Sequence, residues 1–96
     1  MKRVNFNAVL PVTVIREGDA FVAYTPVLDL STVGETLESA KKNFHDAAQV
    51  FFEETYAMGT LNETLLEMGW RKDEQEWTPP AIISHESQSF QVPLHE

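Results

Sequence analysis

A chain of 96 residues with 43% hydrophobic side chains can form one domain with a small core, which excludes a disordered acidic tail. It has no cysteine and no apolar run of membrane-spanning length, which excludes disulfide scaffolds, thiolate zinc sites, cysteine nucleophiles and membrane segments, so we expect a cytoplasmic protein. Its net charge of -8 repels phosphate backbones and favours a basic protein partner.

Three strands are predicted in the first part of the chain. Residues 4–16 are rich in β-branched and apolar side chains, which is typical of a long strand. Pro11 cannot donate a ladder hydrogen bond and therefore indicates an edge strand or a bulge. The sequence Glu17-Gly18-Asp19 favours a turn, residues 20–25 return as a second strand, and residues 28–33 alternate as a third.

A long helix is predicted after Gly34. Thr36 is a suitable N-cap, and Gly59 is a natural residue to follow the last helical position at about Met58. Val50 lies away from the apolar face of this helix, so it is exposed in a monomer or covered by a partner. The apolar face itself has helical spacing and consists of Leu37, Ala40, Phe44, Ala47, Ala48, Phe51, Phe52 and Tyr56.

A short helix and a hairpin are predicted next. The stretch from Thr60 to Glu63 matches a capping box, in which the Thr60 side chain caps a second helix that Gly69 closes. The stretch from Trp70 to Trp77 then predicts a tight hairpin in which the two indoles pack together.

The order strand, strand, strand, helix predicts an α+β fold, with a helix on one face of an antiparallel three-stranded sheet. The other sheet face is then thinly covered, which favours a homodimer, a higher oligomer or a partner protein. Pro79-Pro80 marks a boundary, so we expect a domain at residues 1–80 and a tail at residues 81–96. Within the tail, the alternating apolar side chains of Ser89–Leu94 predict a final strand.

A pattern at residues 18–40 resembles the N-terminal half of the HicB-like antitoxin family. Residues 18–26 (GDAFVAYTP) match its glycine turn, aromatic-x-alanine strand and proline, and residues 34–40 (GETLESA) match the glycine that leads into the helix. The resemblance covers about residues 10–80. Three further stretches look like the continuation in the shorter family members, namely residues 58–61, 69–72 and 77–80.

The resemblance implies a partial ribonuclease-H-like fold that binds a HicA-like toxin, a small basic ribonuclease, and covers its active surface. The distribution of charge agrees with such a partner, since residues 1–16 carry +3 and residues 17–96 carry -11. A basic RNA-binding surface should associate with an acidic protein rapidly and in a salt-dependent way. The candidate partner-binding residues are Asp29 at a strand turn, Glu35 and Glu38 at the helix start, and Val50.

The chain departs from this family at two places. Residues 27–31 read VLDLS where the family often has a proline-glycine-cysteine turn, so this turn and its contacts differ. Many members also carry a C-terminal DNA-binding domain, but residues 81–96 are too few and too poor in lysine and arginine to form one. This argues against direct nucleic-acid binding. A nucleic-acid-binding regulator and a stand-alone oligomeric relative without a toxin are the alternatives.

No catalytic, cofactor-binding or metal-binding residue is predicted, and we expect a protein that is not an enzyme. Metal-dependent nuclease chemistry needs carboxylates on the sheet, and residues 4–16 contain no acid. His45, His85 and His95 lack the spacing of metal ligands. The chain also lacks a serine nucleophile motif and a phosphate-binding glycine loop. A small enzyme on the same scaffold is therefore a third and disfavoured hypothesis.

Overall fold

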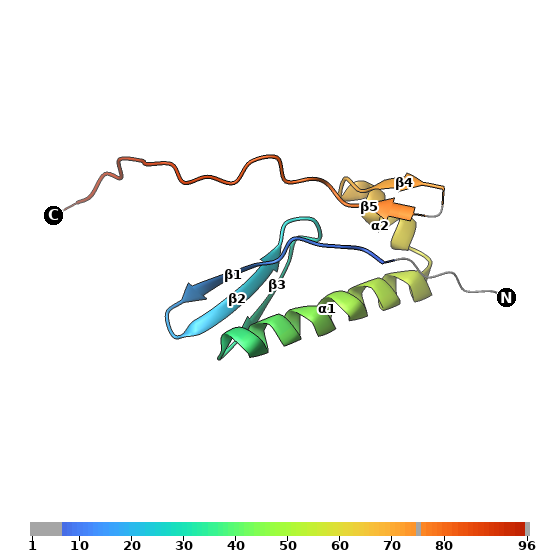
Figure 1. Cartoon of the computed structure of the whole chain (residues 1–96), viewed down its shortest axis with the longest axis horizontal. Helices are drawn as coiled ribbons and strands as arrows, with labels where there is room; N and C mark the ends of the chain where they lie inside the picture. Colours follow the sequence, from blue (N-terminus) through green and yellow to red (C-terminus); the bar gives the residue numbers. More distant parts are fainter. Residues whose placement is uncertain (1–6, 75, 96) are drawn as a thin grey trace.

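A three-stranded antiparallel sheet with a long helix across one face forms the body of the protein (Figure 1). The computed structural model describes residues 7–74 and 76–95. The predicted α+β fold is confirmed, with strand order β1-β2-β3 in the sheet and a separate hairpin of β4 and β5. The elements are β1 (Thr13–Glu17), β2 (Ala20–Thr25), β3 (Leu30–Gly34), α1 (Leu37–Met58), α2 (Leu61–Glu67), β4 (Arg71–Asp73) and β5 (Glu76–Thr78).

Two strands begin later than the sequence predicts. The first begins at Thr13 and not at residue 4; residues 4–6 lie outside the described part, and the described stretch 7–12 forms no strand. Thr13 already pairs with Tyr24, one residue before the end of β2, so among residues 7–12 only Val12 has a residue of β2 left opposite it. The third strand begins two residues after Leu28, because residues 26–29 form the turn that precedes β3.

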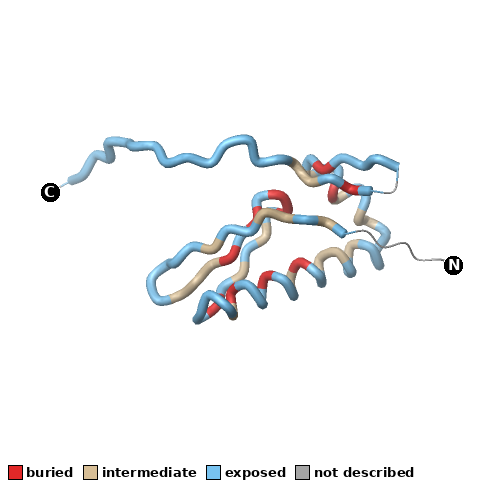
Figure 2. Tube along the Cα trace, viewed as in Figure 1, coloured by how far each residue is buried: buried red, intermediate tan, exposed pale blue. Residues whose placement is uncertain are grey.

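The core lies between the inner face of the sheet, α1 and the C-terminal hairpin (Figure 2). The predicted apolar face of α1 is buried only along part of its length, while Leu37 and Tyr56 at its two ends are exposed. A helix of 22 residues is about 33 Å long. A strand of five residues spans about 17 Å, so the helix extends beyond the sheet. The buried apolar residues are Ala23, Val27, Leu28, Ala40, Phe44, Ala48, Leu65, Trp70 and Trp77.

Trp70 attaches the C-terminal hairpin to the sheet. Its indole Nε1 donates a hydrogen bond to the Val27 carbonyl oxygen at 2.8 Å, and its ring meets that of Phe52 edge-on at 6.2 Å. The predicted hairpin after Trp70 is confirmed as β4 and β5, with Glu74 at a positive φ of 53° in the turn. Both indoles belong to the same buried cluster, so the hairpin closes one end of the core.

The predicted capping box at the start of α2 is wrong. The Thr60 hydroxyl makes no cap bond within α2 and instead donates to the Thr55 carbonyl oxygen at 3.4 Å. Gly59, with φ of 75°, turns the chain at the end of α1, and the Thr60 N–H also bonds Thr55 at 2.9 Å. The Thr60 hydroxyl and N–H thus cap the C-terminal end of α1, although the sequence predicts that the Thr60 side chain caps the start of α2.

The predicted final strand at Ser89–Leu94 does not form within this chain. The whole of residues 81–95 is exposed and runs away from the body, because no described strand lies beside it to pair with. The hydrogen bonds of the described tail residues are local. The Gln88 amide and the Ser84 hydroxyl donate to the Glu86 carboxylate at 2.8 and 3.1 Å and lower the pKa of Glu86.

Thr25 carries a hydroxyl group that the fold does not use. Its side chain is fully buried, and its Oγ1 has no hydrogen-bond partner within the described part of the chain. We expect Thr25→Val to raise the free energy of unfolding by about 1 kcal/mol, because valine keeps the shape and removes a desolvated polar atom.

The matched control for Thr25→Val is Thr32→Val. The free energy of unfolding of both variants is measured by urea unfolding followed by circular dichroism. The Thr32 hydroxyl donates to the Ala40 carbonyl oxygen at 3.2 Å, so its loss should lower the free energy of unfolding by about 1 kcal/mol. Equal shifts of the same sign in the two variants would contradict the assignment of Thr25 as the unsatisfied group.

The bond between Trp70 and Val27 should add to the stability that the buried volume of the indole supplies. Trp70→Phe removes both and should lower the free energy of unfolding by about 3 kcal/mol. Trp77→Phe removes a similar volume from the same cluster but leaves the Val27 bond in place, so about 1–2 kcal/mol is expected. Urea unfolding by circular dichroism measures both; a Trp77 variant as unstable as the Trp70 variant would refute this ranking.

Candidate functional site

An open hollow of about 600 Å³ lies at the end of the sheet where the β1–β2 turn, the end of β3 and the start of α1 meet. Three of the residues that line it are acidic, and no lysine or arginine is among its described lining residues. Its floor is partly apolar, because Val33 and Ala20 also face it. The lining residues with polar side chains are Glu17, Asp19, Glu35, Ser39 and Asn43.

The register of the sheet brings these acids together. Glu17 pairs with Ala20 across the two-residue turn Gly18-Asp19, in which Gly18 has a φ of 63° that glycine adopts without strain. Phe21 then pairs with Gly34, so the β1–β2 turn and the end of β3 lie at the same end of the sheet. Acids that are far apart in the sequence therefore share one hollow.

Gly34 determines how closely the helix approaches this end of the sheet. A Cβ atom at Gly34 would lie 2.4 Å from both the Ala40 backbone nitrogen and the Ser39 Oγ, which is closer than real Cβ contacts allow. Glycine is thus required here by space. The helix begins only three residues later, at Leu37, which fixes Glu35 at the rim of the hollow.

The predicted N-cap Thr36 is confirmed and holds the helix start rigidly. The Ser39 N–H donates to Thr36 Oγ1 at 3.0 Å, and the Thr36 N–H donates to Ser39 Oγ at 3.0 Å, which completes a reciprocal capping box. The Asn43 side-chain amide donates to the Val33 carbonyl oxygen at 2.9 Å and ties α1 to β3. The wall of the hollow is therefore built from hydrogen-bonded elements.

The structure brings together only some of the predicted partner-binding residues. Glu35 lines the hollow, and Glu38 lies in the first turn of α1, three residues further on. Asp29 lies at the other end of β3, where it adopts a φ of 49° and its carboxylate accepts a hydrogen bond from the Tyr24 hydroxyl at 3.4 Å. Val50 is 48% exposed on α1 and does not line the hollow.

Glu17 and Asp19 are the acids that sequence reasoning missed at this site. In the sequence the stretch from Glu17 to Asp19 indicates only a turn. The pairing of Phe21 with Gly34 is what places its two carboxylates in the same hollow as Glu35. The signal available in the sequence was the order of three consecutive strands joined by short turns, since antiparallel pairing of the second strand with the third places the first turn beside the residue after β3.

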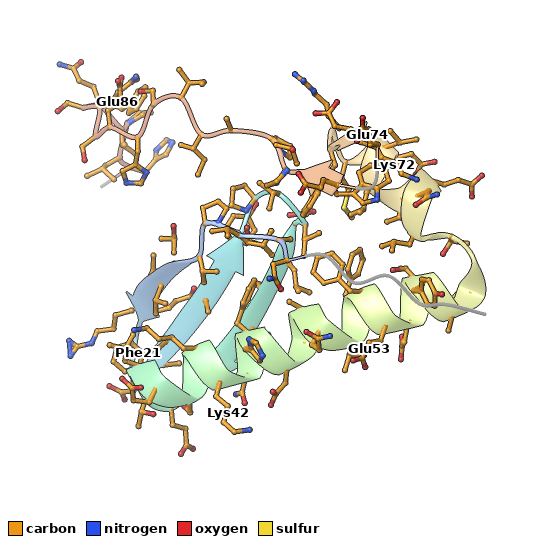
Figure 3. The ribbon with its side chains drawn as sticks, turned by 45° about the vertical axis from the view of Figure 1, so that its right-hand side comes forward. Phe21, Lys42, Glu53, Lys72, Glu74 and Glu86 are labelled. Carbon is orange, nitrogen blue, oxygen red and sulfur yellow. The ribbon has the colours of Figure 1, made fainter. Side chains whose placement is uncertain are left out.

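Basic side chains near this end are engaged elsewhere. The Arg16 guanidinium lies 5.9 Å from the centre of the Phe21 ring, and the Lys42 ammonium pairs with Asp46 at 3.0 Å along α1. Figure 3 shows Lys42 and Glu53 on the side of α1 away from the sheet. The electrostatic field of the hollow is therefore set by its carboxylates.

The chemistry of the hollow is that of an open acidic surface. Within residues 7–74 and 76–95, no three histidine, aspartate or glutamate side chains gather closely enough to hold a metal ion. His45, His85 and His95 are all exposed and none lines the hollow. What the arrangement offers a ligand is negative charge beside apolar side chains, which suits a cationic group carried by another macromolecule.

The outer face of the sheet continues this surface. Ile15, Val22 and Val33 face each other in register across β1, β2 and β3, on the side opposite the buried Ala23. Ile15 is 51% exposed and Val33 is 59% exposed, so the row is open to solvent. Because Val33 also lines the hollow, the acidic and apolar surfaces are contiguous.

Comparison with known proteins gives no relative. The chain matches no protein-family model, and no curated protein or solved structure matches it significantly. The likeness to HicB-like antitoxins therefore depends on the residue pattern described above. Among the described residues, no helix is long and apolar enough to cross a membrane.

The close approach at Gly34 can be tested by adding one methyl group. We expect Gly34→Ala to lower the free energy of unfolding by about 2 kcal/mol or more, because the new Cβ overlaps the backbone of Ala40. Gly18→Ala is the matched control: nothing lies within 4 Å of its new Cβ, so only the positive φ costs about 1 kcal/mol. Thermal unfolding measures both, and a Gly34 variant as stable as the Gly18 variant would refute the steric argument.

Proposed function

We propose that this chain is an antitoxin-like binding protein that neutralises a small basic ribonuclease, a HicA-like toxin, by covering its RNA-binding surface. The observation that carries the proposal is the hollow lined by Glu17, Asp19 and Glu35 without a lysine or arginine among its described lining. The resemblance of residues 18–40 to the HicB-like family supports the same partner. Both proteins would then meet in the cytoplasm.

The negative charge of the hollow favours a partner protein with a basic, RNA-binding surface. A ribonuclease binds phosphates through lysine and arginine, and the carboxylates of an acidic hollow attract the same cationic groups. Arginine is the best match, because its planar guanidinium donates two hydrogen bonds to one carboxylate at once. The net charge of -8 adds long-range attraction, which accelerates encounter at low ionic strength.

The apolar row beside the hollow supplies the other component of a stable protein interface. Protein interfaces combine a buried apolar centre with a polar rim, and charged contacts alone contribute more to encounter rate and specificity than to affinity. Here Ile15, Val22 and Val33 lie next to the acids. A partner that seats basic residues in the hollow would cover this row with its own apolar side chains.

Charge reversal in the hollow tests this proposal. The double variant Asp19→Lys, Glu35→Lys should inhibit a basic ribonuclease encoded beside this chain at least about tenfold less well than the unchanged protein. The control is Glu53→Lys, Glu54→Lys, which makes the same change of net charge on exposed acids of α1 outside the hollow. The measurement is RNA cleavage during titration at low and at moderate salt.

Three results would contradict the proposal. The first is no inhibition by the unchanged protein at low salt, and the second is an equal loss of inhibition in both double variants. The third is a loss with Asp29→Asn or Val50→Asp that exceeds the loss in the hollow variant, which would move the contact to the other end of β3 or to α1.

A further inference from the structure

A second hollow, of about 390 Å³, lies where residues 8–14 lead into the edge strand β1, and it shares no lining residue with the acidic one. We call it the edge groove. Its walls are mostly apolar, and it runs between the chain that leads into β1 and the flank of α1. On the side of the chain that leads into β1, every second residue lines it, including Leu10, Val12 and Val14. On the side of α1, residues one helical turn apart line it, including Phe44, Ala48 and Phe52.

The edge groove has the shape that an additional strand would fill. β1 is an edge strand in the order β1-β2-β3, so one side of its backbone has no neighbouring strand among the described residues. The inward side chains of a strand added there would continue the inner face of the sheet beyond Val14, over Phe44 and Phe52 of α1. The helix packs mainly on β3 and β2, which leaves this space open.

The tail of this same chain carries a matching segment. Phe90, Val92 and Leu94 alternate with Ser89, Gln91 and Pro93, so an extended conformation separates an apolar face from a mainly polar one. The three apolar side chains are 79%, 73% and 85% exposed. The segment thus has the pattern of a half-buried strand, but in a single molecule its apolar face is exposed to solvent.

The path of the tail points to a second copy. From Pro80 to Ser89 the extended chain spans about 30 Å, whereas β1 with five residues spans about 17 Å. In Figure 1 the tail accordingly passes the tip of the β1–β2 hairpin, and the molecule is 65 Å long. To return to its own β1 the tail would have to reverse, yet the turn-favouring residues of 81–92 are serines alone, without a glycine, proline, asparagine or aspartate.

Charge does not oppose the approach of the tail to the β1 edge. Residues 7–16 contain no acid, and the one acid of β1 is its last residue, Glu17. Ser89–Leu94 carries no charge at all, so it can approach another acidic body at this edge without repulsion.

From these observations we infer that Ser89–Leu94 of one copy adds as a strand to the free edge of β1 of a second copy, with Phe90, Val92 and Leu94 in the edge groove. Reciprocal exchange of the two tails gives a dimer. The inference goes beyond the proposed function and does not depend on it, because the edge groove shares no lining residue with the acidic hollow.

The oligomeric state of full-length variants tests the exchange. Sedimentation should show a dimer of the unchanged chain, and Val92→Glu should raise the dimer dissociation constant at least about a hundredfold, because two buried valines per dimer are lost. Gln91→Glu places the same charge on the opposite face of the strand and should leave the dimer nearly unchanged. A monomeric unchanged chain, or a dimer that tolerates Val92→Glu, would overturn the inference.

A second experiment locates the contact and separates exchange from a tail folded on its own body. The chain has no cysteine, so Ser89→Cys gives a single site for a nitroxide label. The labelled copy is mixed with an unlabelled, isotope-enriched copy, and the amide signals of residues 12–15 in the enriched copy should broaden. A label at Asn62→Cys on α2 is the control and should not broaden them. Broadening found only when label and isotope share one chain would overturn the exchange.

Discussion

The close approach of α1 to Gly34 is the constraint on which the rest of the structure depends. Because Gly34 has no side chain, the backbone of Ala40 can pack directly against the end of β3. This contact sets the height of the helix above the sheet, and the buried residues Phe44 and Ala48 follow from it along the same face. It also leaves Glu35 in the short link between β3 and α1, where it lines the same hollow as Glu17 and Asp19.

The sequence predicted those features that are encoded locally. The β1–β2 turn, the N-cap Thr36 and the end of α1 at Gly59 each depend on residues a few positions apart, and all three are observed. Features that depend on a distant partner were predicted less well. The first strand begins only where Tyr24 is present to pair with it, and residues 89–94 form no strand without a neighbour, although both segments have the right composition.

The candidate site shows the same limit. Glu35 was recognisable as an acid at the start of a helix, but Glu17 and Asp19 join it only through the register of two strand pairs. Asp29 shows the opposite case, since it is six residues from Glu35 in sequence yet lies at the other end of a strand. The side of the protein on which a charge lies follows from strand length and pairing, which residue types alone do not specify.

The placement of the two tryptophans has a consequence for how the protein can be observed. Trp70 and Trp77 are the only tryptophans of the chain, and both belong to the part that follows α2. Indole fluorescence therefore reports on the attachment of the C-terminal hairpin, whereas far-ultraviolet circular dichroism is dominated by the 22 residues of α1. Two optical signals from one unlabelled sample thus follow different elements of the same core, and their coincidence during unfolding measures whether this small domain behaves as a single cooperative unit.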